Sequence, residues 1–192
     1  MKERTGDFDC QRLLVEAHEQ FVWCWLGKRD GFEPAEVDAL ARARPRHSLL
    51  GLGEPGQGLA GWRQTHHQAR AALSVAVRGT ESVVRYADAA LLASVLKDDL
   101  LATSLRQIYL EPLEGGRDGG EELRVTLRAY FSAGRNVSVA GEAIGVTRQA
   151  VARRLRAAEE RIGRPLTSCG ADLEVALSLE ALEPSPTPPS AP

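Results

Sequence analysis

Apolar and polar residues alternate in patterns that predict strands and helices in the first half of the chain and helices alone in the second. The runs RLLVEAH (12–18) and FVWCWLG (21–27) favour strands and are separated by a two-residue polar break, which predicts a hairpin. Because both faces of the second run are apolar, we expect that strand to be central and covered on both sides. Further strands are predicted at 47–53 and 82–86, and helices at 33–43, 62–77, 88–97 and 99–110.

After residue 120 the apolar positions follow helical spacing. The first helix is predicted over 121–134, with a buried face made of Leu123, Leu127, Tyr130 and Phe131. A very short helix is expected next, with Asn136 and Ser138 supplying the turn and the cap. Its predicted buried side consists of Val139, Ala140, Ala143 and Ile144.

A third helix is predicted from Thr147, its capping residue, onward. Gly145 can take the left-handed conformation that ends the preceding helix in one step, and Val146 is expected to pack under the corner. The predicted buried stripe of the third helix is Val151, Leu155, Ala158 and Ile162. A short helix, a glycine turn and a second helix form the helix-turn-helix plan, in which the second helix enters the major groove of DNA.

Two changes in composition divide the chain. The glycine-rich EGGRDGG (114–120) predicts a linker, and the proline-rich EPSPTPPSAP from Glu183 predicts extended, unpacked chain. We therefore expect an α/β domain over 1–112, a linker over 113–120, a helix-turn-helix domain over 121–183 and a disordered tail over 184–192.

The charge is unevenly distributed, which changes what the overall value of -2 means. Between Arg124 and Arg164 there are nine arginines and three glutamates, a balance of +6, so the remainder carries -8. The basic segment coincides with the predicted helix-turn-helix and favours double-stranded DNA as the partner. An arginine-rich helix can also be a solvated face held by ion pairs, here with Glu159 and Glu160, and this alternative stays open.

The exposed side of the third helix supplies the candidate DNA-binding residues. Arginine matches guanine and glutamine matches adenine through paired hydrogen bonds, and a small residue allows contact with a thymine methyl group. The predicted base-facing residues are Arg148, Gln149, Ala152 and Arg153. The predicted phosphate contacts are Thr147, Arg154, Arg156 and Arg161.

In the stretch GLGEPGQGLAGWRQTHHQARAAL (51–73), a glycine-proline loop and a Leu-Ala-Gly turn lead into a long helix rich in Ala and Arg. This stretch resembles the GGDEF-like middle domain of the PucR/CdaR family of bacterial transcription regulators, and the likeness extends over about 10–112. The segment 121–182 resembles the C-terminal helix-turn-helix domain of the same family, through Leu127 to Tyr130, the Asn136-Val137-Ser138 turn, Val146, Arg148, Val151, Arg154-Leu155 and Ile162-Gly163. The resemblance implies an α+β fold, in which a degenerate GGDEF-like domain, shortened at its start, precedes an all-α domain.

The family pattern also implies a closing helix and contains departures. The closing helix corresponds to 171–182 and would bury Leu173, Ala176, Leu177 and Leu179. Thr147 stands where the family commonly has histidine, Gln149-Ala150 where it has Asn-Thr, and Arg153 where tyrosine is common. Because these positions face or approach the groove, the operator of relatives cannot be transferred to this chain.

One motif suggests an enzyme but has the wrong context. The stretch GGEEL (119–123) is one residue away from the GGEEF signature of diguanylate cyclases, which lies on a tight hairpin between strands. Here an amphipathic helix follows, so Glu121 and Glu122 are interpreted as first-turn carboxylates at a helix N-terminus. We therefore expect no enzymatic activity and no cofactor. A metal site is not expected either, since the three cysteines are scattered and form no CxxC.

These observations favour a bacterial, cytoplasmic, DNA-binding transcription regulator that acts as a homodimer, with RNA polymerase as a further candidate partner. Membrane association is not expected, because no apolar run approaches the roughly 20 residues of a spanning helix and the N-terminus carries charges. The alternative is a non-enzymatic module that dimerises or binds a ligand or protein, with the helical domain as an assembly surface. The sensed signal, the operator and the direction of regulation stay open.

Overall fold

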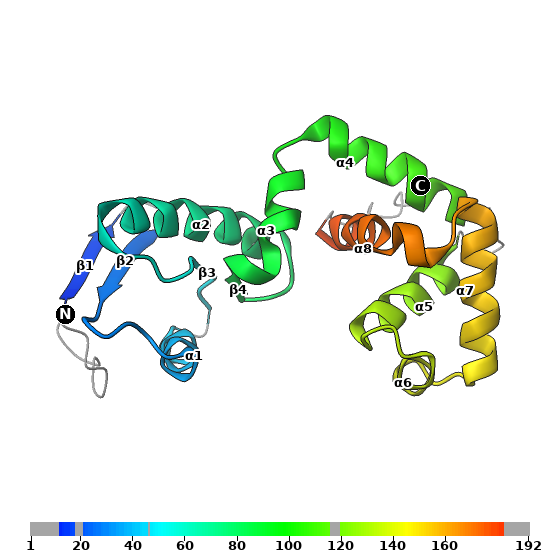
Figure 1. Ribbon diagram of the computed structural model, residues 1–192, viewed down its shortest axis with the longest axis horizontal. Coiled ribbons are helices and arrows are strands. Elements are labelled where there is room, and N and C mark those ends of the chain that lie inside the picture. Colours follow the sequence, from blue (N-terminus) through cyan, green and yellow to red (C-terminus); the bar gives the residue numbers. More distant parts are fainter. Residues whose placement is uncertain (1–11, 18–20, 46, 116–119, 183–192) are drawn as a thin grey trace, which may run out of the picture.

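The computed structural model describes residues 12–17, 21–45, 47–115 and 120–182. Figure 1 shows them in two regions: an N-terminal region that contains two small sheets, and residues 99–182, whose described part is helical and which we call the helical unit. Helix α3 (Tyr86–Val95) lies between the two regions. The α+β fold class predicted from the sequence is confirmed.

The predicted hairpin is present, but its second strand is not central. Strands β1 (Arg12–Ala17) and β2 (Val22–Gly27) pair antiparallel, from Arg12 opposite Gly27 to Ala17 opposite Val22. Among the described residues β2 pairs only with β1, and Val22 is 56% exposed, so the prediction of a strand covered on both sides is wrong. The aromatic face of β2 packs on a helix, while the face that carries Val22 and Cys24 stays open.

The rest of the N-terminal region packs around one long helix. Helix α1 (Pro34–Ala43) starts with a capping box between Glu33 and Glu36. Strands β3 (Leu50–Leu52) and β4 (Val83–Arg85) pair in parallel and contact α2 (Gly58–Arg78). Strand β3 is shorter than predicted, and α2 starts at Gly58 rather than at residue 62.

Small residues let α2 lie close to its neighbours. The core of this region consists of Ala71, Ala72, Val75, Ala76, Val84, Ala89 and Ala93. At Gly53 the backbone after β3 approaches α2 so closely that an added Cβ would lie 2.1 Å from the carbonyl oxygen of Thr65. The contact is therefore made between backbones, and side chains contribute little apolar volume to it.

The helical unit has the larger core. Helix α4 (Asp99–Leu105) continues into the π-helical turn η1 (Arg106–Leu110) and the 3-10 turn η2 (Glu111–Glu114). Four helices follow: α5 (Glu121–Ser132), α6 (Val137–Ala143), α7 (Arg148–Ile162) and α8 (Leu166–Leu182). Helix α8 starts five residues before the predicted 171, and the predicted Leu173, Ala176, Leu177 and Leu179 are all buried in the core.

The segment before α5 packs against the helix-turn-helix. Leu105, Tyr109, Leu110 and Leu113 are buried in the same core as α5, α7 and α8. The linker predicted over 113–120 stays a prediction, because residues 116–119 lie outside the described residues, as does the tail predicted over 184–192. Leu113 itself is fully buried, so the chain is packed up to the last turn before those residues.

Candidate nucleic-acid interface

The turn between α5 and α6 is built as the sequence predicts. Gly134 and Arg135 both have positive φ, at 60° and 66°, and reverse the chain after α5. The side chain of Asn136 accepts hydrogen bonds from the backbone N–H groups of Ser138 (3.0 Å) and Val139 (3.2 Å). These two bonds satisfy donors that a helix N-terminus otherwise leaves unpaired, so Asn136 fixes the start of α6.

The turn between α6 and α7 is closed by backbone contacts. Gly145 has φ +70°, as predicted, and the N–H of Val146 donates to the carbonyl of Gly141 at 2.9 Å. A Cβ added at Gly141 would lie 2.7 Å from the carbonyl oxygen of Val146. Thr147 then caps α7 by accepting a hydrogen bond from the N–H of Ala150 at 3.2 Å. The angle between α6 and α7 is therefore set by glycine and cap geometry.

The buried side of α6 differs from the prediction. Ala140 is fully buried and Ile144 is partly buried, but Val139 is 47% exposed and Ala143 is exposed, so the prediction is wrong for these two residues. The inward face is instead Val137, Ala140, Gly141 and Ile144, the i, i+3, i+4, i+7 pattern of a helix. Counting only apolar side chains missed Gly141, whose lack of a side chain is what allows the close contact.

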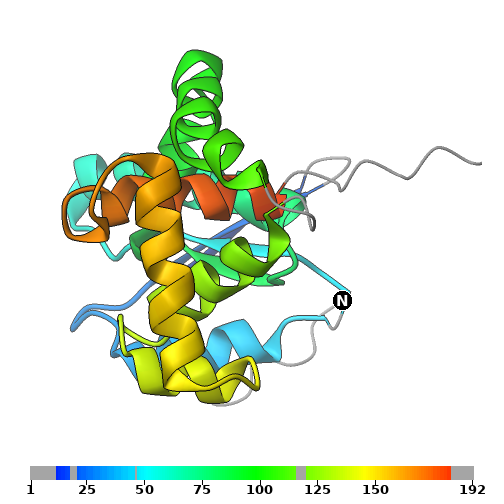
Figure 2. The same cartoon turned by 90° about the vertical axis from the view of Figure 1, so that its right-hand side faces the viewer.

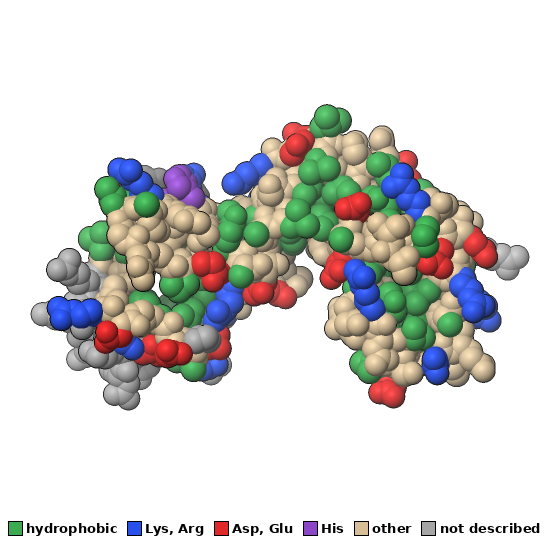
Figure 3. Space-filling model, viewed as in Figure 1, with side chains coloured by type: hydrophobic (Ala, Val, Ile, Leu, Met, Phe, Trp, Pro, Cys, Tyr) green, Lys and Arg blue, Asp and Glu red, His purple; other side chains and the backbone are tan. Residues whose placement is uncertain are grey.

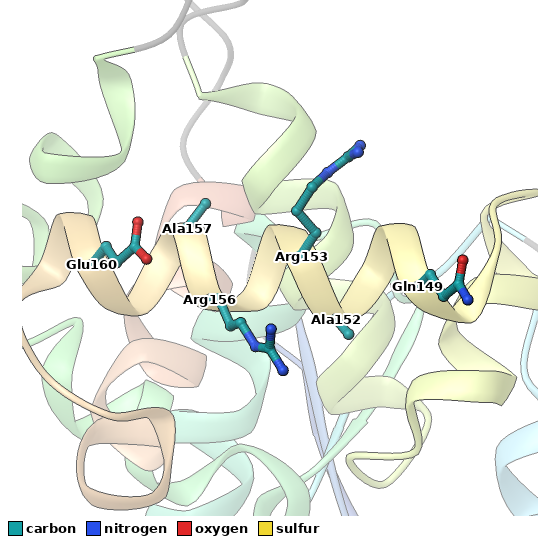
Figure 4. Close-up of a pocket in the computed structure, with 6 residues that line it drawn as sticks. All are labelled: Gln149, Ala152, Arg153, Arg156, Ala157 and Glu160. Atoms are coloured by element: carbon teal, nitrogen blue, oxygen red, sulfur yellow. The ribbon is translucent and has the colours of Figure 1, made fainter.

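Helix α7 has the predicted division into a buried and an exposed face. Val151, Leu155 and Ala158 are buried and Ile162 is partly buried. The exposed face carries Gln149, Ala152, Arg153, Arg156, Ala157 and Glu160, which line an open hollow of about 430 Å³ along the helix. In Figure 4, Arg153 and Arg156 extend away from each other, from opposite sides of the helix.

Four polar side chains at the exposed face of α7 have no partner among the described residues. Arg148, Gln149, Arg153 and Arg156 are exposed and make no hydrogen bond or ion pair within the part of the chain that the structure describes. Figure 2 shows α7 in front of the other helices with α6 at its lower end, so no described element covers it. In Figure 3, Lys and Arg side chains lie along the edge of the molecule that α7 forms. The face is available to an anionic partner.

Two other candidate residues on α7 are used within the chain. The guanidinium of Arg154 forms an ion pair with Glu122 on α5, and Nη1 of Arg161 donates to the carbonyl of Leu113 at 2.6 Å. Sequence reasoning missed both contacts, because the partners are 32 and 48 residues away and leave no local pattern. Whether either residue also touches phosphate stays a prediction.

The carboxylates of the GGEEL stretch lie where the sequence predicts. Glu121 and Glu122 occupy the first turn of α5, and Glu121 lies 3.8 Å from Nη1 of Arg128. They lie at a helix N-terminus, which favours negative charge, and no hairpin of the described residues presents them. The site therefore lacks the strand-turn-strand arrangement that the cyclase signature needs.

Comparison with known families identifies both regions. Residues 123–181 match the PucR C-terminal helix-turn-helix domain, and residues 2–75 match the GGDEF-like domain. No curated protein matches the chain. Among the described residues no helix combines the length and apolarity needed to cross a bilayer.

The geometry and the match over α5–α8 define a helix-turn-helix protein of the DNA-binding, transcription-regulating class. With the GGDEF-like domain in front of it, the chain has the architecture of the PucR/CdaR-type regulators, as the resemblance predicts.

Proposed function

We propose that this protein is a bacterial, cytoplasmic regulator that binds double-stranded DNA sequence-specifically, with α7 as the recognition helix. One observation carries the proposal: α7 follows a tightly built turn and presents Arg148, Gln149 and Arg153 to solvent without any described partner. Unpaired guanidinium and amide groups near the N-terminus of a second helix are placed to reach base edges in the major groove.

The roles follow from the chemistry of each side chain. Arg148 and Arg153 can pair with O6 and N7 of guanine, and Gln149 with both acceptor and donor of adenine. Ala152 lies on the same exposed face and allows close approach, or contact with a thymine methyl group. Thr147 retains its hydroxyl hydrogen after accepting the cap bond, so it can donate to a phosphate, and Arg156 can reach the backbone on the other side.

A homodimer is the form in which these residues would act. One recognition helix contacts few base pairs, and two copies related by a two-fold axis read two half-sites. RNA polymerase is the further partner that an activating regulator would contact.

The proposed mechanism is non-catalytic. Glu121 and Glu122 are placed at the start of α5, where they pair with arginines. Incubation of the full chain with GTP and Mg²⁺ should therefore yield no cyclic dinucleotide. Formation of product would contradict this part of the proposal.

The main experiment compares two arginines of equal charge. An operator is first selected from random DNA with the full chain, and affinities are then measured by fluorescence anisotropy. Arg148→Ala should lower operator affinity about 10- to 100-fold, the size of a lost paired base contact, and relax base preference at one position. Arg63→Ala removes the same charge from the exposed side of α2 and should change affinity little.

The same measurements distinguish the DNA-binding regulator from the alternative, an assembly module without DNA affinity. Binding to any duplex should weaken steeply between about 50 and 200 mM salt if arginines meet phosphates. A chain that binds no DNA even at the lower salt would refute the regulator and favour the assembly module. Equal losses on operator and scrambled DNA from Arg148→Ala would refute its base-reading role.

A further inference from the structure

Arg154 faces the interior of the helical unit although it lies in the middle of α7. Its side chain is 17% exposed, and its Nη2 is paired with the Glu122 carboxylate. Its Nη1 lies 3.4 Å from the hydroxyl of Thr126, one turn further along α5. Both contacts join α7 to α5, and Thr126 is itself fully buried.

Arg161 fixes the other end of the helix. Its Nη1 donates to the carbonyl of Leu113 in η2, a residue with no exposed surface. The same turn is held by Arg124, whose Nη2 lies 3.3 Å from the carboxylate of Glu114, and whose Nε lies 3.0 Å from Glu180 on α8. The C-terminal end of α7 is thus tied to a turn that is anchored independently.

The remaining arginines of α7 behave differently. Arg148, Arg153 and Arg156 project into solvent and have no partner among the described residues. Arg154 would have to give up its ion pair with Glu122 before neutralising a phosphate, so its contribution to DNA affinity would be reduced by the energy of the lost pair. Arg161 is exposed, but its hydrogen bond to the Leu113 carbonyl directs the guanidinium toward η2.

We propose that Arg154 and Arg161 are positioning residues, which hold the recognition helix against α5 and η2 and do not contact phosphate. The proposal rests on the proposed function, because it assigns their effect on DNA to the placement of Arg148, Gln149 and Arg153. Base-edge hydrogen bonds require close alignment, so a small tilt of α7 weakens specific contacts and leaves non-specific, phosphate-driven binding largely intact.

Removing the charge of Glu122 separates the two roles of Arg154, because the roles predict opposite signs. If Arg154 contacts phosphate, Glu122→Gln frees it and operator binding becomes tighter. If Arg154 positions α7, Glu122→Gln loosens the helix and operator binding becomes about 3- to 10-fold weaker, the size of one ordinary hydrogen bond, because Glu122 is more than half exposed. Glu121→Gln is the matched control, since it removes the same charge from the same helical turn.

The expected pattern extends to Arg154 itself. Arg154→Ala should lower operator affinity and the ratio of operator to scrambled-DNA affinity, and Arg154→Lys, which keeps one charged donor, should restore part of that ratio. The double variant with Glu122→Gln should be no worse than Arg154→Ala alone. Circular dichroism first gives the melting temperature of each variant, and all affinities are measured below the onset of unfolding. A purely structural role would lower the melting temperature and leave the ratio of operator to scrambled-DNA affinity unchanged.

Salt dependence tests Arg161 against Arg156 on the same helix. A lost phosphate contact reduces the slope of log affinity against log salt by about 0.9. Arg156→Ala should show that reduction, whereas Arg161→Ala should weaken operator binding with the slope unchanged.

A reduced slope for Arg161→Ala, or tighter operator binding by Glu122→Gln than by Glu121→Gln, would overturn the positioning role of the residue concerned. Wild-type protein that binds no DNA at low salt would instead refute the proposed function.

Discussion

The two regions of the molecule differ in how completely each one buries its apolar residues. In the helical unit Leu113, Leu127, Val151 and Leu173 have no exposed surface. In the hairpin of the N-terminal region Leu14, Val15, Phe21 and Val22 are between 42% and 56% exposed. The helical unit closes its own core, whereas the hairpin has one apolar face that no described element covers.

The difference follows from how each region is connected. Helices α5, α6 and α7 are consecutive and are joined by short turns with capping residues, and α8 and the turns before α5 complete their core. The hairpin contacts the rest of its region through aromatic rings, with Trp25 5.4 Å from Trp62 and 5.4 Å from His66 between ring centroids. Such contacts join segments about 40 residues apart, so forming them requires the closure of a long stretch of chain.

The largest expected effect is on the helical core. Leu127→Ala removes a fully buried side chain and should lower the free energy of unfolding by about 2–5 kcal/mol. The loss should appear in far-ultraviolet circular dichroism, which reports mainly the helices. Tryptophan fluorescence should change less, because all three tryptophans (Trp23, Trp25 and Trp62) lie in the N-terminal region.

Val15→Ala is the control for this comparison. Val15 lies opposite Cys24, on the open face of the hairpin, and is 51% exposed, so its truncation should change the unfolding free energy by no more than about 0.5 kcal/mol. A cost close to that of Leu127→Ala would mean that the outer face of the hairpin is buried in solution, against a second copy or another segment. That outcome would remove the contrast between the regions.

The sequence predicted the helical unit better than the sheets for a physical reason. Asn136, Gly145 and Thr147 act within three residues of their own positions, so turn and cap chemistry identified them directly. The exposure of Val22 could not be read in the same way, since it depends on how many strands join the sheet. The inward direction of the Arg154 side chain could not be predicted either, because it depends on the ion pair with Glu122 in another helix.

A smaller effect is expected from glycine substitutions in the turn between α6 and α7. They test whether this turn depends on the close backbone contact at Gly141 or on the positive φ of Gly145. Gly141→Ala would stabilise an isolated helix by up to about 1 kcal/mol. Here the new methyl group would lie 2.7 Å from the carbonyl of Val146, so we expect a net loss of about 1–3 kcal/mol and weaker DNA binding.

Gly145→Ala separates the two causes. Its φ of +70° is unfavourable for alanine, but no atom lies within 4 Å of the added Cβ, so the cost should be strain alone, about 1 kcal/mol. Both unfolding energies can be measured by urea titration followed by circular dichroism. A stabilised Gly141→Ala variant would show that α6 can move away from the turn, and that the angle of α7 is not set there.

The smallest effect concerns the packing of α2 on the hairpin and depends on pH. The ring of His66 contacts the rings of Trp23 (4.6 Å between centroids) and Trp25 (5.4 Å), and burial lowers the pKa of His66 below the ordinary 6.5. The positive charges of Arg70 and His67 lower the pKa of His66 further, whereas Glu16 acts in the opposite direction. His66 is therefore neutral in the folded protein at pH 7.

The sign of the pH effect follows from this lowered pKa. Below about pH 6.5 the unfolded chain binds a proton at His66 more readily than the folded chain does. The packing of the neutral ring therefore contributes its full stability above that pH. This contribution is lost as the pH falls toward the lower pKa that His66 has in the folded protein. The urea midpoint followed by tryptophan fluorescence should decrease on acidification from about pH 7.5 to 5.5. It should decrease less in His66→Phe, which keeps the ring contacts and cannot be protonated.

A midpoint that rises on acidification would show that attraction between a charged His66 and the two indole rings outweighs the cost of burying the charge. The hairpin would then be held to α2 by a cation–π contact, and the weaker of the two regions would gain stability under the conditions expected to loosen it.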